Sequence, residues 1–180
     1  MKFIQVSDIH LGTPDALING CSPTERLHAC FKDIISCHSD AEFCVITGDL
    51  TEFAEPAAYK HLKEILSEFS LPCFLMLGNH DDRKVFQSIF VGYSQDKNGF
   101  VQYSLRTASG IFLFLDTKKE GLEAHEGQMC NLRLKWLQEE LISLKHAHRR
   151  SVGLHPLINA SGTPRCMSET CTNFMLFKTF

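Results

Sequence analysis

Strand-like and helix-like segments alternate through the first half of this chain. Short apolar runs at 3–6, 43–46 and 73–77 alternate with segments at 23–35, 56–69 and 83–90, whose apolar residues recur at helical spacing. Such a succession predicts βαβ units, in which neighbouring strands run parallel and helices cover the sheet. A chain of 180 residues has enough material for one domain with a buried core and too little for two.

Each of the three apolar runs ends in residues that can bind a metal. Asp8 and His10 follow the first run, Asp49 follows the second, and Asn79 and His80 follow the third. Because the carboxyl ends of parallel strands meet at one edge of a sheet, we expect these side chains to lie together. Asp8 and His10 are two residues apart, so in an extended chain they point the same way and can share one cation.

The residue types around these positions favour a divalent metal over simple turn chemistry. Gly48 and Gly78 precede the polar tips and give the backbone freedom to turn sharply. A mixture of carboxylate, imidazole and amide oxygen suits Mn, Fe(II) or Zn, and Asp49 is placed to bridge two ions. A single Asp or Asn at a strand end is commonly a turn residue, but recurrence at every strand end favours the metal site.

The second half of the chain has a different pattern. Alternation at 101–105, a turn at 108–110 and an apolar run at 111–115 predict an antiparallel hairpin. A helix is expected over 132–144, and a short strand over 151–154 leads to His155, a further candidate ligand. Beyond residue 158 the pattern dissolves, so we expect one domain over 1–158 and an irregular tail over 159–180.

Three motifs carry a resemblance to a known family. Asp8-Ile9-His10, Gly48-Asp49-Leu50 and Gly78-Asn79-His80-Asp81 resemble the signature of the calcineurin-like metallophosphoesterases. The start Ser7-Asp8-Ile9-His10 and the short spacing between motifs are most similar to bacterial class III cyclic nucleotide phosphodiesterases and their glycerophosphodiesterase relatives. The resemblance implies an α/β fold of the four-layer α/β/β/α sandwich type with a site for two divalent metals.

The resemblance also implies a role for each motif residue. The implied metal ligands are Asp8, His10, Asp49, Asn79 and His155. Asp8 and His10 would hold the first metal, Asp49 would bridge, and Asn79 and His155 would hold the second. His80 would approach the scissile phosphate without ligating. Asp81 beside it would either orient the His80 ring or cap the helix that begins near Asp82.

The implied reaction is the hydrolysis of a phosphodiester, most simply a 3′,5′-cyclic nucleotide such as cyclic AMP. Two metals lower the pKa of a shared water, whose hydroxide attacks phosphorus while His80 assists the departing alkoxide. A glycerophosphodiester is the alternative substrate. A protein of another class, non-catalytic and with a defective metal site, is the other alternative.

One departure from the family pattern bears on that choice. The family usually ends its metal site with a Gly-His-x-His motif, and the residues after His155 contain no histidine. We therefore expect a domain that is incomplete at its C-terminal end. Its metal site should be weakened and could hold one metal instead of two. His146 and His148 lie among basic residues and are better explained as a solvated helix end than as replacement ligands.

Charge and composition limit the partners. The net charge is −3 and the 18 Lys and Arg residues are scattered, which argues against a nucleic-acid polymer. A signal-peptide pattern and a run of about 18 apolar residues are both missing, so we expect a cytoplasmic protein that does not enter a membrane, with reduced cysteines. The expected partner is a small phosphodiester, and a homodimer is allowed.

Overall fold

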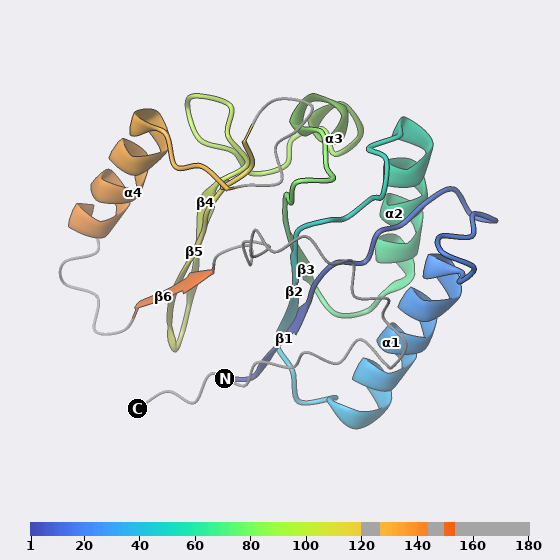
Figure 1. Ribbon diagram of the computed structural model, residues 1–180. Coiled ribbons are helices and arrows are strands. Elements are labelled where there is room, and N and C mark those ends of the chain that lie inside the picture. Colours follow the sequence, from blue (N-terminus) through green and yellow to red (C-terminus); the bar gives the residue numbers. More distant parts are fainter. Residues whose placement is uncertain (120–126, 144–149, 154–180) are drawn as a thin grey trace.

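The first half of the chain forms a parallel three-stranded sheet with a helix after each strand (Figure 1). The computed structural model describes residues 1–119, 127–143 and 150–153. In chain order the elements are β1 (Phe3–Val6), α1 (Pro23–Cys37), β2 (Phe43–Thr47), α2 (Pro56–Glu68), β3 (Cys73–Met76) and α3 (Arg83–Ile89). The strand order is β1-β2-β3 with β2 in the centre, which confirms the predicted βαβ units.

The second half forms another three-stranded sheet. The predicted hairpin is confirmed as β4 (Tyr103–Thr107) and β5 (Gly110–Phe114), which pair in antiparallel fashion. The predicted helix is α4 (Asn131–Ser143), and the strand after it is β6 (Arg150–Gly153). β6 pairs in parallel with β5, so it extends the second sheet and is separate from β1, β2 and β3.

Three apolar layers hold the two sheets and their helices together. One lies between the first sheet and its helices and includes Ile46, Leu62 and Leu75. The other two use opposite faces of β5, because successive strand residues point to opposite sides. Phe112 and Phe114 meet the first sheet at Phe43, Val45 and Met76, whereas Ile111 and Leu113 meet α4 at Trp136, Leu137 and Leu141. Figure 1 shows the resulting α/β/β/α order, with α1 and α2 outside the first sheet and α4 outside the second. The expected four-layer fold is confirmed.

The helix starts follow from their capping residues. The Ser22 side chain accepts a hydrogen bond from the Glu25 N–H at 3.2 Å, and Pro23 occupies the first helical position of α1, as the sequence predicts. Asp82 caps α3, and its carboxylate accepts a hydrogen bond from the Val85 N–H at 2.8 Å. Of the helices in the described part of the chain, none is long and apolar enough to cross a membrane.

Candidate metal centre

The loop after β1 turns through an unusual backbone conformation. Asp8 and His10 have φ values of 57° and 44°, in the left-handed region that costs an L-residue about 1–2 kcal/mol. Hydrogen bonds from Asp8 N–H to the Gly48 carbonyl (3.3 Å) and from His10 N–H to the Asp49 carbonyl (2.9 Å) hold this loop beside the one after β2. The extended conformation predicted here is therefore wrong. The two side chains still converge, because His10 Nε2 lies 4.0 Å from Asp8 Oδ1.

The loop after β2 buries the Asp49 carboxylate, of which only one oxygen accepts a hydrogen bond among the described residues. Gly48 turns the chain at φ 93°, as predicted, and Asp49 follows at φ 46° with no exposed surface. Asp49 Oδ1 accepts a hydrogen bond from the His80 N–H at 3.0 Å. Asp49 Oδ2 lies 3.7 Å from His10 Nε2 and finds no hydrogen-bond donor in the described part of the chain. A buried carboxylate oxygen without a partner is costly, and a bound cation would remove that cost.

Gly78, at the end of β3, is required by close approach. A Cβ atom placed there would collide with the Asp49 carboxylate and with the Asp49 backbone nitrogen. Gly78 itself does not adopt a left-handed conformation, so the predicted reason, freedom to turn, is right for Gly48 and wrong here. The absence of a side chain at Gly78 leaves room for the Asp49 carboxylate, which accepts the His80 N–H.

Two of the predicted ligands, His10 and Asp49, gather with His80, which was predicted to act on the phosphate without ligating. Ligand atoms of His10, Asp49 and His80 all lie within 4.8 Å of one another. The two imidazole rings meet edge to face, with centroids 4.7 Å apart. Two carboxylates, one of them fully buried, therefore face a pair of imidazoles, and this donor set fits Mn, Fe or Zn.

Of the remaining predicted ligands, Asn79 is located by its backbone and its neighbours, and His155 is not described. Asn79 lies between Gly78, which abuts Asp49, and His80, whose N–H binds Asp49. The Asn79 carbonyl accepts a hydrogen bond from Lys118 Nζ at 3.2 Å. His155 lies outside the described residues, as do His146 and His148.

The tautomer of His80 follows from its hydrogen bond. Its Nδ1 lies 2.9 Å from the Glu52 backbone carbonyl, and since a carbonyl can only accept, Nδ1 carries the proton. The other ring nitrogen, Nε2, is thereby left for a ligand or a substrate oxygen. The ring is half-buried, in keeping with a group that works at the surface of a site.

Glu52 is a site residue that the sequence reasoning missed. Its Oε2 lies 2.7 Å from His10 Nδ1, in a geometry too bent for a hydrogen bond, and 3.8 Å from His80 Nδ1. With its carbonyl on His80 as well, Glu52 contacts both histidines. Metal-binding histidines commonly donate their second ring N–H to a carboxylate, and Glu52 Oε2 is a carboxylate oxygen at 2.7 Å from His10 Nδ1. The signal was a carboxylate three positions after Asp49, which a solvated loop would also explain.

Asp81 links the loops of the site, so both roles predicted for it are wrong. It is 2% exposed, and its carboxylate accepts hydrogen bonds from donors on three segments: Leu50 N–H, Thr51 N–H, Thr51 Oγ1, Tyr59 OH and Gly78 N–H. Burial raises the pKa of Asp81 to about 6, against the lowering effect of the Gly78 and Leu50 hydrogen bonds. Asp81 therefore fixes the loop after β2 to the end of β3.

Comparison with known proteins identifies the family to which this arrangement belongs. Residues 1–169 match the model of the calcineurin-like phosphoesterases. The chain belongs to this family. Its members are metallophosphoesterases that depend on two metal ions, which agrees with the cluster of His10, Asp49 and His80. The resemblance inferred from the three sequence motifs is thereby confirmed.

Several curated relatives in this calcineurin-like family carry phosphodiesterase names. The chain is 38% identical over 141 residues to a probable cyclic nucleotide phosphodiesterase of Rhodopseudomonas palustris, covering 78% of this chain and 52% of the relative. It is 28% identical over 152 residues to the 3′,5′-cyclic adenosine monophosphate phosphodiesterase of Escherichia coli K12, covering 82% and 52%. A probable cyclic nucleotide phosphodiesterase of Rhodococcus erythropolis is 29% identical over 143 residues, covering 77% and 46%. The chain thus spans about half the length of these relatives.

Proposed function

We propose that this chain carries the metal centre of a phosphodiesterase that hydrolyses 3′,5′-cyclic nucleotides such as cyclic AMP. The names of its relatives support the substrate class. The convergence of Asp8, His10, Asp49 and His80 supports a metal-dependent hydrolase. The proposed metals are two divalent ions, Mn, Fe or Zn, because the donors are carboxylate and imidazole.

One observation carries the proposal: Asp49 Oδ2 is buried, has no donor among the described residues, and faces His10 Nε2 at 3.7 Å. The loop after β3 packs closely on Asp49. A side chain at Gly78 would collide with the Asp49 carboxylate, and the His80 N–H donates to it. We assign the metal ligands as Asp8, His10, Asp49, Asn79 and His155, with Asp49 shared between the two ions.

The chain's own residues divide the chemistry between them. Two bound metals supply positive charge for the phosphoryl oxygens and lower the pKa of water that attacks phosphorus. His80 serves the other side of the reaction. Its Nδ1–H is held by the Glu52 carbonyl, so Nε2 is the nitrogen that faces substrate. A protonated His80 donates from Nε2 to the leaving oxygen as the phosphorus–oxygen bond breaks.

The test is hydrolysis by the full 180-residue chain in added Mn²⁺, with cyclic AMP, a glycerophosphodiester and bis(p-nitrophenyl) phosphate as substrates. We expect the wild-type chain to hydrolyse cyclic AMP faster than the glycerophosphodiester and Asp49→Asn to be inactive. Equal, background-level rates for the two proteins would refute the function. A faster rate on the glycerophosphodiester would support phosphodiester hydrolysis but refute a cyclic nucleotide as the preferred substrate.

His80 is tested by changing the leaving group. His80→Asn should slow cyclic AMP hydrolysis by about 10²–10⁴-fold, because a sugar alkoxide needs a proton to depart. The loss should be much smaller on bis(p-nitrophenyl) phosphate, since p-nitrophenolate leaves without protonation. Equal losses on both substrates would contradict proton donation by His80 and indicate a different role.

A further inference from the structure

We propose that Lys118 is a positioning residue that holds the Asn79–His80 turn in place for metal binding. The contact that points to this role is the hydrogen bond from Lys118 Nζ to the Asn79 carbonyl at 3.2 Å. The inference rests on the proposed function, since it takes Asn79 as a metal ligand.

The turn after β3 is anchored from two sides. Three of its contacts come from the half of the molecule built on the first sheet: Gly78 N–H binds Asp81 (2.8 Å), His80 N–H binds Asp49 (3.0 Å), and Asp82 N–H binds the Tyr59 hydroxyl (2.9 Å). The contact at the carbonyl of Asn79 comes instead from the segment that follows β5 of the second sheet. Lys118 therefore joins the second sheet to the turn that presents the ligand.

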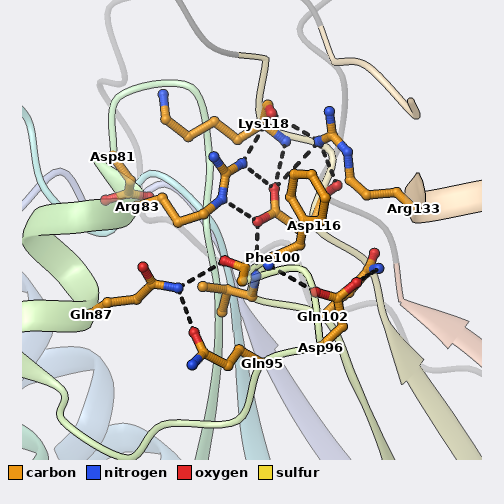
Figure 2. Close-up of polar contacts among 12 residues, drawn as sticks. Asp81, Arg83, Gln87, Gln95, Asp96, Phe100, Gln102, Asp116, Lys118 and Arg133 are labelled. Carbon is orange, nitrogen blue, oxygen red and sulfur yellow. Dashed lines mark hydrogen bonds and ion pairs between the residues drawn. The ribbon is translucent and has the colours of Figure 1, made fainter. Parts of the chain in front are cut away.

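The backbone of Lys118 is itself clamped (Figure 2). Its N–H donates to Asp116 Oδ1 at 3.1 Å, and its carbonyl accepts from Arg83 Nη2 (3.2 Å) and Arg133 Nη1 (2.9 Å). Arg83 in turn binds both oxygens of the fully buried Asp116 carboxylate, at 2.7 and 2.8 Å. Arg133 reaches the Asp116 backbone carbonyl at 2.8 Å. Because these hydrogen bonds hold the Lys118 backbone, its side chain extends from a fixed position and can hold the Asn79 carbonyl in place.

The ammonium group is partly withdrawn from water, which strengthens its bond to the carbonyl. Lys118 is half-buried. A charge-assisted hydrogen bond in such surroundings holds its geometry better than the same bond in solvent. Lys63 offers the comparison: its Nζ donates to the Ile89 carbonyl at 2.9 Å on the exposed surface between α2 and α3.

The test measures Mn²⁺ affinity by calorimetric titration of the chelator-treated 180-residue chain, with cyclic AMP kinetics alongside. Lys118→Met removes the bond and should weaken Mn²⁺ binding by about 10-fold, as loss of an orienting contact does in other metal sites. Lys118→Arg keeps a cationic donor and should recover most of the affinity. Lys63→Met breaks a matched bond away from the site and should leave the affinity unchanged. Near-ultraviolet circular dichroism checks that each variant is folded.

Asn79→Ala separates the failure of this inference from failure of the proposed ligand set. If Asn79→Ala weakens Mn²⁺ binding but Lys118→Met does not, Lys118 has no positioning role and the ligand set stands. A rise in KM for cyclic AMP at unchanged Mn²⁺ affinity would likewise overturn positioning and make Lys118 a phosphate contact. If Asn79→Ala binds Mn²⁺ like the wild type, Asn79 is not a ligand and the inference falls with it.

Discussion

Replacing Asp49 by Asn should stabilise the metal-free protein while destroying its metal site. The amide has the same size, and its oxygen can keep the hydrogen bond from the His80 N–H. Its NH₂ group takes the place of Oδ2, the buried oxygen that has no donor among the described residues. Asn also tolerates the left-handed backbone that Asp49 adopts at φ 46°. The substitution therefore removes a buried charge and breaks no contact that the fold requires.

The size of the effect follows from the same observations. His10 Nε2, at 3.7 Å from the Oδ2 position, is too far to accept a hydrogen bond from the new NH₂ group, so the gain comes only from removing the buried charge. An unpartnered buried group costs about 1–3 kcal/mol and a charged one costs more, so metal-free Asp49→Asn should gain about 1 kcal/mol. With metal present, the wild type should become the more stable of the two proteins. An ion that binds only its folded state adds about 2.7 kcal/mol to its free energy of unfolding at a concentration one hundred times the Kd. The variant, which has lost the shared ligand, gains nothing from the ion.

The assay is urea unfolding followed by circular dichroism at one pH near neutrality, first with chelator and then with Mn²⁺. Asp96→Asn is the matched control, since Asp96 is also buried but its carboxylate accepts hydrogen bonds from Asn98, Phe100 and Gln102. It should be destabilised in both conditions. If metal-free Asp49→Asn is less stable than the wild type, Asp49 has a structural partner and the reasoning about its orphaned oxygen is wrong.

Four further predictions concern the surroundings of the site and the core. Gly78→Ala should displace the Asp49 carboxylate and weaken Mn²⁺ binding by about 10-fold or more in a calorimetric titration; unchanged affinity would contradict the close approach. Glu52→Ala should weaken Mn²⁺ binding by about 10-fold and Glu52→Gln by less, whereas equal, wild-type affinities would remove Glu52 from the site. Asp81→Ala should lower the free energy of unfolding by about 4 kcal/mol in urea, because it leaves several donors unmet; a loss below about 1 kcal/mol would refute its linking role. Phe112→Ala should cost about 3–5 kcal/mol by the same measurement, since its ring packs edge-on against Phe3 and Phe43, and a smaller loss would indicate a loosely packed inter-sheet core.

The elements of the fold were predictable because their signals are local. The cap at Ser22, the apolar spacing of α1 and α2, and the turn between β4 and β5 all lie within a few residues of the element they define. The layer order came from the motif resemblance and not from these patterns. The sequence pattern predicted a strand at 151–154, and the structure has β6 at Arg150–Gly153. The pattern carried no information on which sheet β6 joins, since that depends on its pairing with β5.

The sequence predicted that Asp8, His10, Asp49 and His80 lie together, but not the backbone geometry that brings them together. Asp8 and His10 do converge, but through left-handed backbone held by carbonyls some forty positions away, and no local pattern encodes that. The contacts of Glu52 and Lys118 also join residues that are far apart in the sequence. Lys118 reaches Asn79 across 39 positions, and its residue type would suit any exposed loop. Residues whose role depends on such distant partners become visible only once the loops are assembled.

Calorimetric titration of Mn²⁺ into the chelator-treated 180-residue chain shows whether the edge of the first sheet is a metal centre organised on Asp49. Saturable binding is expected for the wild type, the same binding for Asp96→Asn, and none for Asp49→Asn. No saturable binding by the folded wild type, or the same binding curve for wild type and Asp49→Asn, would contradict this assignment.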